Sequence, residues 1–181
     1  MGEFGRGQAI RRLEDQRFIT GTGQYTDDIS LEGQTYLYIF RSPYAHGTIN
    51  RLEVVEAAAS PGVVAVYTAD DLKAAGVRDV PGASLPATAS EGAKDAIQQP
   101  PLARDRVRYV GEPVAAVLAE TLLQAKDAAE LIELEIDELE AAVRPADALQ
   151  NGAETIHERA PGNHYGTLGY GDREAADAAF S

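Results

Sequence analysis

Three histidines and one row of carboxylates are the side chains in this sequence whose types suit metal binding or acid–base catalysis. The histidines are His46, His157 and His164, and none has a second histidine four positions away, the spacing by which one helix face holds a metal ion. The carboxylates alternate along one segment, at Glu133, Glu135 and Asp137. A strand would place them on one face, but a calcium loop also needs carbonyl ligands and a turn glycine. We therefore interpret them as a solvated sheet face and expect no metal site.

The serines and glycines form no catalytic or phosphate-binding pattern. No serine lies in a Gly-x-Ser-x-Gly elbow, and those weighed as nucleophiles lie beside prolines or in loops, at Ser42, Ser60, Ser84 and Ser90. The glycine-rich segments do not have the Gly-x-Gly-x-x-Gly spacing of a dinucleotide-binding loop; they begin at Gly5, Gly21 and Gly166. We interpret these segments as turns, because glycine permits positive φ.

A small basic cluster is the remaining candidate. Arg11, Arg12 and Arg17 stand together in an otherwise acidic sequence. Guanidinium groups suit an anion or an acidic partner surface, although we favour the interpretation as a plain solvated arm. We therefore assign no catalytic, cofactor-binding or metal-binding residue to this chain.

Composition places the chain among folded proteins of ordinary size. It has 181 residues, 44% of them hydrophobic and 25% charged, which suits one domain with its own core. Its net charge of −13 has the wrong sign for binding a phosphate backbone, so we expect no nucleic-acid partner. Without cysteine the chain holds no disulfide, thiolate zinc site or cysteine-ligated iron–sulfur cluster. The longest apolar run, Pro113–Ala119, is too short to span a membrane, and no secretion signal precedes it, so we expect a cytoplasmic protein.

Hydrophobic periodicity predicts a mixed α/β domain. Aromatic and aliphatic residues alternate over 35–42, and apolar residues recur over 48–55, so we predict a hairpin of two strands with a bulge near Asn50. A helical turn at 56–60, a β-branched strand at 63–67 buried on both faces, and a short helix from Thr68 to Gly76 follow.

The second part of the pattern is a strand–helix–strand unit. Residues 106–110 and 113–119 predict two strands joined at Gly111 and Glu112. Thr121 and Gln124 form a capping box that begins a helix. Strict alternation from Ile132 to 137 then predicts a half-buried strand whose polar face is entirely acidic.

Three segments lack a clear period. Residues 5–29 mix charges and glycines, which is typical of an extended arm, and residues 77–105 hold four prolines in a long loop. Beyond residue 144 the pattern weakens to one possible strand near 164–170, and the final AADAAFS predicts the start of another apolar element. We divide the chain into an arm (1–30), a domain (31–145), and a linker with the beginning of a following domain (146–181).

Three stretches, taken in order from about Gly7 to Pro145, resemble the same protein family. The first is GQAIRRLEDQRFITGTGQYTDDI, before the first strand. The second and most distinctive is LYIFRSPYAHGTINRLEVVEAAASPGVVAVYTADDL, with an Arg-Ser-Pro-x-Ala-His turn from Arg41 to His46. The third is VRYVGEPVAAVLAETLLQAKDAAELIELEIDELEAAV, entered through a Val-Gly-Glu-Pro turn. Together they are similar to the start of the large, molybdopterin-binding subunit of the molybdenum hydroxylases, the group of aldehyde oxidase, xanthine dehydrogenase and carbon monoxide dehydrogenase.

The resemblance implies an α/β hammerhead domain, a mixed-sheet fold that fits the βαβ units predicted from periodicity. It also implies that the complete subunit holds molybdenum on a molybdopterin dinucleotide. Such a subunit hydroxylates an aldehyde, a purine or other N-heterocycle, or oxidises carbon monoxide, with water as the oxygen source. Electrons would leave through iron–sulfur and FAD-containing partner subunits of a hetero-oligomer. The family's cofactor-binding loops and its general-base glutamate belong to later domains, so no catalytic residue is carried over.

These expectations leave alternatives open. Because the arm follows Met1 directly and cysteine is absent, we expect the iron–sulfur and flavin groups on separate subunits. In the leading hypothesis the chain is a structural and assembly domain, and AADAAFS continues into further strands of the molybdopterin-binding domains. The alternative is a stand-alone hammerhead module that binds a protein partner without redox activity. A small hydrolase that uses the carboxylate row is a third hypothesis.

Overall fold

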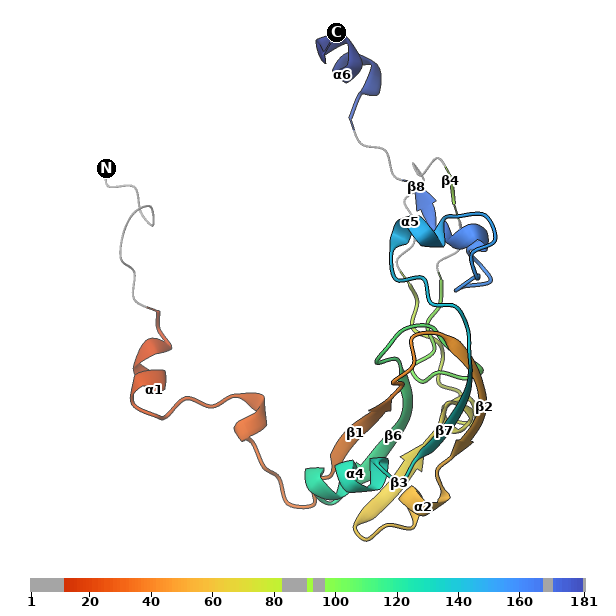
Figure 1. Cartoon of the computed structure of the whole chain (residues 1–181). Helices are drawn as coiled ribbons and strands as arrows, with labels where there is room; N and C mark the ends of the chain where they lie inside the picture. The colour runs from red at the N-terminus through yellow and green to blue at the C-terminus, as the bar shows by residue number, and fades with distance from the viewer. Residues whose placement is uncertain (1–11, 83–90, 93–96, 168–170, 181) are drawn as a thin grey trace, which may run out of the picture. The chain divides into compact units, whose positions relative to one another are not determined.

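In the first part of the chain, the described residues form short helical turns. A computed structural model of the protein describes residues 12–82, 91–92, 97–167 and 171–180, and its contacts divide the chain into two units, 1–34 and 35–181 (Figure 1). The first unit contains α1 (Asp15–Ile19) and a 3-10 turn, η1 (Thr26–Asp28). Within the predicted arm, these two segments are thus short helical turns. Local bonds explain the turns: the Asp28 carboxylate accepts from the Tyr25 N–H at 2.8 Å, and the rings of Phe18 and Tyr25 stack.

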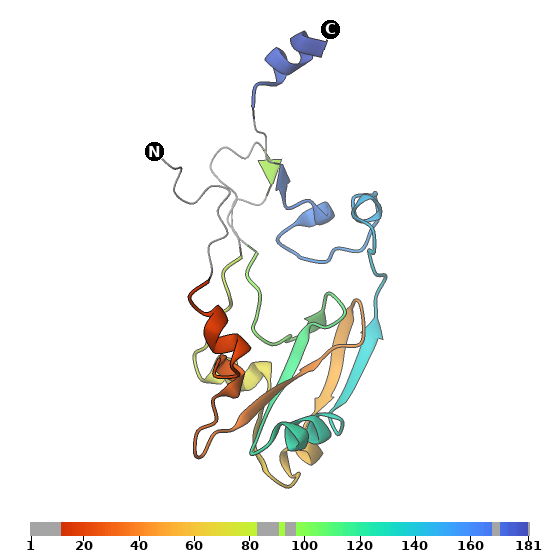
Figure 2. The same cartoon turned by 90° about the vertical axis from the view of Figure 1, so that its left-hand side faces the viewer.

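Two three-stranded antiparallel sheets form the second unit. Sheet A has the order β1-β6-β3, made of β1 (Tyr36–Arg41), β6 (Pro113–Ala119) and β3 (Val63–Tyr67). Sheet B has the order β5-β2-β7, made of β5 (Arg106–Val107), β2 (Gly47–Glu53) and β7 (Glu133–Glu138). Figure 2 shows β2 and β7 side by side. Mixed helices and sheets confirm the predicted fold class.

The predicted hairpin of the first two strands is wrong. β1 pairs with β6, whereas β2 pairs with β5 and β7, so consecutive strands lie in different sheets. The chain between them is held to distant segments: the Ser42 N–H donates to the Glu112 carbonyl at 2.9 Å, and the His46 carbonyl accepts from the Leu139 N–H at 3.0 Å. The bulge near Asn50 is confirmed, because the register with β7 shifts between Ile49 and Arg51. The strands predicted on both sides of Gly111 also form, but in different sheets, and β5 has only two residues.

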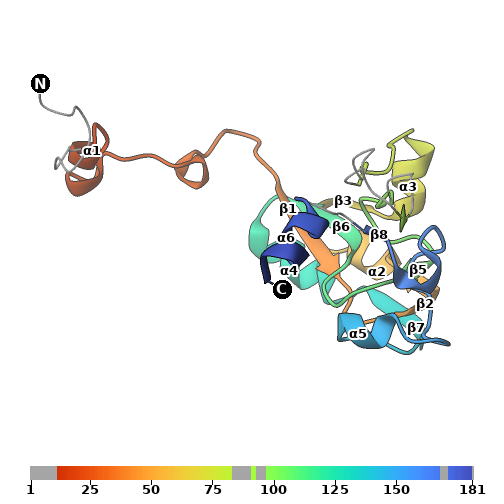
Figure 3. The same cartoon turned by 90° about the horizontal axis from the view of Figure 1, so that it is seen from above.

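The main core lies on both faces of the central strand β6. On one face, Ala115, Val117 and Ala119 pack against α4 (Leu122–Ala129) and against Ala57 of α2 (Val55–Ala58). On the other face, Ala116 packs with Leu102 and with α3 (Ala69–Ala74). Figure 3 shows α3 and α4 on opposite sides of sheet A. Small side chains on β6 let both layers approach the strand closely.

The strand at 63–67 is an outer strand, so the prediction that both of its faces are buried is wrong. Val64 is exposed, and the pairing with β6 is interrupted between Val63 and Ala65. A run of β-branched residues is typical of two-sided burial only where neighbours flank the strand on both edges. β3 has one such neighbour, β6.

Both predicted helix starts are confirmed in position. The Thr121 hydroxyl accepts from the Gln124 N–H at 3.2 Å, although the Gln124 side chain accepts from that hydroxyl rather than from the Thr121 amide. In α3 the Asp71 carboxylate accepts from the Thr68 N–H at 2.7 Å, and its bonds to Thr68 lower the pKa of Asp71. Gly76, at φ +75°, ends that helix as predicted.

The remaining elements are short. They are β4 (Glu91–Gly92), α5 (Pro145–Ala148), η2 (Pro161–Asn163), β8 (Gly166–Thr167) and α6 (Arg173–Phe180). In the long predicted loop, Val80 and Gln99 exchange backbone hydrogen bonds and β4 pairs with β8; residues 83–90 and 93–96 of that loop lie outside the described part. Residues 173–180 form α6, because alanine favours helix and the Asp172 carboxylate accepts from the Ala175 N–H at 3.0 Å. None of the helices in the described ranges is long and apolar enough to cross a membrane.

Candidate functional site

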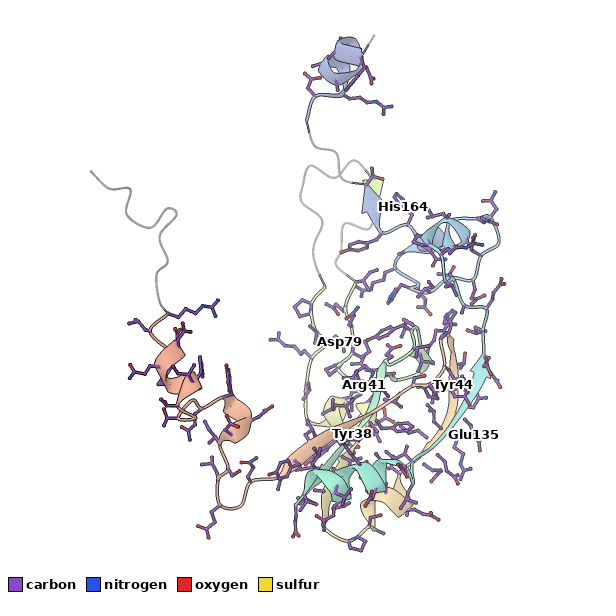
Figure 4. All side chains as sticks on the ribbon, turned by 60° about the vertical axis from the view of Figure 1, so that its left-hand side comes forward. Tyr38, Arg41, Tyr44, Asp79, Glu135 and His164 are labelled. Atoms are coloured by element: carbon purple, nitrogen blue, oxygen red, sulfur yellow. The ribbon has the colours of Figure 1, made fainter. Side chains whose placement is uncertain are left out.

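The two turns singled out by the sequence motifs lie against each other. The Ser42 carbonyl accepts from the Gly111 N–H at 2.8 Å, and the Ser42 N–H donates to the Glu112 carbonyl at 2.9 Å. The Arg41 guanidinium also donates to the Gly111 carbonyl at 2.9 Å. We call residues 41–46 and 108–112 the motif-turn cluster; Arg41 and Tyr44 mark it in Figure 4. Its hydrogen bonds hold the end of β1, where the chain leaves sheet A, beside the start of β6, where the chain enters that sheet again.

Ser42 uses its hydroxyl to hold its own turn. The side chain is buried, and its Oγ accepts from the Tyr44 N–H at 3.0 Å and lies 3.1 Å from the Tyr44 carbonyl, to which it donates. Ser60 likewise donates to the Glu56 carbonyl within α2. Ser84 and Ser90 lie outside the described residues. The hydroxyls of Ser42 and Ser60 thus serve the backbone rather than a base.

His46 is the most buried titratable side chain of the cluster, with 3% of its surface exposed. Its Nδ1 lies 3.0 Å from the Glu140 carbonyl, which can only accept, so Nδ1 carries the proton. In the neutral ring Nε2 is then an acceptor, and no partner for it exists among the described residues. His46 therefore ties the turn to the chain that follows β7 and retains one unused lone pair.

Glu112 and Arg108 close the other side of the cluster. The buried Glu112 carboxylate accepts from the Arg108 N–H. Burial raises the pKa of Glu112, and the bond from Arg108 opposes that rise. The Arg108 guanidinium donates to the Ile156 carbonyl at 3.2 Å and to the Arg106 carbonyl at 3.1 Å. Sequence reasoning missed this role of Arg108, because nothing local marks a bond to a residue 48 positions away.

The structure brings two of the three histidines together. Burial lowers the pKa of His157, and the neighbouring Arg108 guanidinium and His46 imidazole lower it further. His164 lies elsewhere, beside β8, with its Nε2 3.0 Å from the Thr167 hydroxyl. Within the described ranges no three histidine, aspartate or glutamate side chains gather in a way that suits a metal ion.

Asn163 orders the loop that carries His157. Its backbone adopts the left-handed region at φ +55°. Its Oδ1 accepts from the Ile156 N–H at 2.9 Å, and its Nδ2 donates to the carbonyls of Ala148 and Glu154 at 3.1 and 2.9 Å. Asparagine tolerates this conformation better than most residues. The sequence offered no signal for this role beyond the neighbouring Pro-Gly.

The carboxylate row is an exposed sheet face with a basic partner. Arg51 on β2 contacts Glu133 at 3.7 Å and Glu135 at 3.1 Å across the strands, and Glu53 at 3.2 Å on its own strand. Hydrogen bonds to Glu135 and Glu53 raise the pKa of Arg51. Asp137 is exposed on the same strand. The row is therefore part of a surface charge network.

The arginine cluster and two of the glycine segments lie in the first unit or outside the described residues. Arg12 and Arg17 are exposed, and Arg17 lies 6.0 Å from the centre of the Phe18 ring. Arg11 and the segment that begins at Gly5 lie outside the described residues. The segment at Gly21 is a turn, with φ +71° at that glycine.

A cavity of 290 Å³ adjoins the motif-turn cluster and mixes charges of both signs. Its ionisable lining comprises Asp79, Arg104, Asp105, Arg108, Glu112, His157, Glu158 and Arg159. Arg104 pairs with Asp79, and Arg108 is bound to backbone carbonyls. The polar groups of this region are thus largely occupied in joining chain segments. We call this arrangement of hydrogen bonds and ion pairs the brace, because it holds the two sheets in a fixed orientation.

Residues 20–140 match the family model described as "Aldehyde oxidase and xanthine dehydrogenase, a/b hammerhead domain". The nicotine 6-hydroxylase large subunit of Paenarthrobacter nicotinovorans is 39% identical over 97% of this chain and 20% of its own length. The carbon monoxide dehydrogenase large chain of Hydrogenophaga pseudoflava is 36% identical over 93% of this chain and 21% of its own.

Solved structures agree with these sequence matches. A crystal structure of the Cu,Mo-CO dehydrogenase superposes with a TM-score of 0.77 at 32% identity, over 96% of this chain and 22% of the other. This chain thus spans about a fifth of the length of the relatives that it matches. It belongs to the aldehyde oxidase and xanthine dehydrogenase family of molybdenum hydroxylases and contains the family's a/b hammerhead domain.

Proposed function

We propose that this chain is the structural and assembly domain of a molybdenum hydroxylase large subunit whose catalytic centre lies outside the 181 residues. The observation that carries the proposal is the match over nearly the whole chain to about a fifth of such subunits. The Escherichia coli relative, 36% identical over 141 residues, is called the molybdenum-binding subunit of xanthine dehydrogenase. The complete enzyme would hydroxylate an aldehyde or N-heterocycle, or oxidise carbon monoxide, in the cytoplasm.

The residues of this chain do not fit the family's molybdopterin dinucleotide. That group carries a pyrophosphate, and the cavity beside the motif-turn cluster has four carboxylates against three guanidinium groups in its lining. Its 290 Å³ is also at the lower limit of the roughly 300–1,000 Å³ typical of small-molecule sites. We therefore derive no catalytic step from this chain. Iron–sulfur and FAD groups on partner subunits would receive the electrons.

The brace formed by the motif-turn cluster supports an assembly role. The side chains of Ser42, His46 and Glu112 are all buried, and each forms a hydrogen bond to main-chain atoms. Side-chain hydrogen bonds to the main chain of distant segments rigidify a domain and fix its surfaces, although Nε2 of His46 has no partner among the described residues. A rigid domain presents its exposed surfaces to neighbouring domains in one orientation.

The test uses the endogenous polypeptide that contains this sequence. We would purify it from its source cell, determine its intact mass, and measure its molybdenum content and its dye reduction with nicotine, carbon monoxide and xanthine. We expect a chain about five times longer than this one, with stoichiometric molybdenum. The 181-residue chain, expressed alone, is the control and should hold no molybdenum.

Two results would contradict the proposal. Stoichiometric molybdenum in the 181-residue chain would place the centre here. An endogenous polypeptide of only 181 residues, without a larger co-purifying partner, would favour the stand-alone interaction module.

A further inference from the structure

Three of the four outer strands in the two sheets are poor templates for another strand. β5 has only two residues. β3 contains an irregularity between Val63 and Ala65, and bulges of this kind disrupt edge pairing. β7 carries Glu133, Glu135 and Asp137, and charges along an outer strand oppose strand addition. Figure 4 labels Glu135 on this strand.

The fourth outer strand, β1, carries such features only at its end, where the register with β6 shifts between Phe40 and Arg41. Its register with β6 is continuous from Tyr36 to Phe40, and only Arg41, at its end, is charged. Among the described residues of this unit, no strand pairs with its other edge. Alternate residues of an antiparallel strand direct their N–H and C=O groups to that edge, so β1 presents backbone groups that a further strand would satisfy.

A groove of 620 Å³ lies between β1 and α4. Its lining consists of Tyr38, Ile39, Phe40, Arg41, Lys126, Ala129 and Glu130. Successive side chains of a strand point to opposite faces, so a groove lined by four consecutive residues follows the strand's edge. Tyr38 and Arg41 mark it in Figure 4. Leu37, next to it, is 58% exposed, which leaves an apolar surface beside the open edge.

We propose that this edge of β1 binds an extended strand supplied by the remaining part of the same large subunit. The inference rests on the proposed function, because it requires the chain to be part of a longer subunit. This chain spans 22% of the carbon monoxide dehydrogenase chain on which it superposes, so most of such a subunit lies outside it. The bound strand places apolar side chains over Tyr38 and Phe40 and an acidic side chain near Arg41 and Lys126.

A second copy of this chain fits the edge less well. Each copy carries a net charge of −13, and this repulsion opposes self-association. In an antiparallel β1–β1 pair, the added strand would also bring no carboxylate to Arg41 and Lys126, since β1 contains none and Glu130 is the one acidic side chain in the groove lining. A strand of complementary charge from the same subunit satisfies both requirements.

Amide hydrogen exchange compares the complete subunit, in its native complex, with the 181-residue chain. Exchange over residues 36–41 is expected to be at least about tenfold slower in the complete subunit, because paired edge amides exchange only when the strand opens. Leu37→Lys in the complete subunit should remove most of that protection by placing a charge beside the edge. Leu123→Lys is the matched control, since Leu123 is 68% exposed on α4, and it should leave the protection unchanged. Unchanged exchange in β2 and β7 verifies that each variant is folded.

Several outcomes would overturn the inference. Equal exchange at residues 36–41 in both proteins would show that nothing covers the edge. Protection that rises with the concentration of the 181-residue chain would assign the edge to a second copy, and protection lost on deletion of residues 1–34 would assign it to the chain's own first unit. Mass and molybdenum content of the same preparation separate the two proposals: a molybdenum-containing large subunit with an unprotected β1 refutes only this inference. A polypeptide no longer than this chain refutes both.

Discussion

Replacing Gly47 with alanine should destabilise the domain more than any exposed substitution. Gly47 is the buried first residue of β2, paired with Val107 on one side and Glu138 on the other. A Cβ at this position would lie 2.3 Å from Cγ2 of Ile136 and 2.7 Å from the carbonyl oxygen of Asp137. Both contacts are shorter than van der Waals distance, and the carbonyl belongs to a paired strand that cannot rotate away.

The expected magnitude follows from these two contacts. Overpacking a well-packed site costs about 1–3 kcal/mol, and the backbone contact places Gly47→Ala near the upper end. For a chain of this size, about 3 kcal/mol corresponds to a fall in Tm of roughly 6–12 °C. Urea unfolding followed by circular dichroism measures the free energy of unfolding and, through a constant m-value, verifies that the unfolded state is unchanged.

Two further variants make the interpretation specific. Gly76→Ala is the control: that glycine has φ +75°, but a Cβ added there would meet no atom within 4 Å, so only backbone strain of about 1 kcal/mol is expected. In an Ile136→Ala background the penalty of Gly47→Ala should shrink, because one of its two clashes is gone. The reasoning is refuted if Gly47→Ala costs no more than Gly76→Ala, or if its cost is the same in both backgrounds.

Two predictions concern the loop around His157. Asn163→Ala removes three side-chain hydrogen bonds and should therefore speed amide exchange at Ile156. Asn163→Gly also removes these bonds but allows the same backbone conformation, and it should speed the exchange as well. Slow exchange in the glycine variant would mean that backbone strain, and not the lost hydrogen bonds, causes the effect of Asn163→Ala. Burial and the Arg108 guanidinium lower the pKa of His157 below its ordinary value of 6.5. As the pH falls through 6.5, the unfolded state therefore binds a proton before the folded state does, and the free energy of unfolding should decrease. His157→Gln should reduce this fall between about pH 7.5 and about pH 5.5, and an identical fall in the variant would contradict the assignment.

Local patterns in the sequence predicted the elements of the fold better than their partners. The capping residues Thr121 and Gln124, the buried strand β6 and the half-buried strand β7 depend on neighbours a few positions away, and all three form. The hairpin prediction failed because residues 42–46 have the composition of a turn, while bonds to Gly111 and Glu112 decide which sheet each strand joins. Such long-range bonds leave no periodic signal in the sequence.

The site was predictable only in part, for the same reason. The Arg-Ser-Pro-x-Ala-His turn directed attention to His46, and the structure places it in the buried cluster. The contributions of His157 and Asn163 come from a segment without a clear period, and that of Arg108 comes from a residue predicted only as part of a strand. Contacts between segments so far apart in the sequence require the fold before their members can be named.

The strand pairing also determines when each sheet can form during translation. Among the described residues, β1 and β3 pair only with β6, and β2 pairs only with β5 and β7, so these three strands lack their described partners until residue 106 has been synthesised. At roughly 5–20 residues per second, the ribosome needs about 2–8 s to pass from the end of β3 to the start of β5. During that interval the apolar run Val63–Tyr67 has no sheet to join. Sheet A can become complete once β6 has been synthesised to Ala119, whereas sheet B must wait for the end of β7 at Glu138, so sheet A is able to form first.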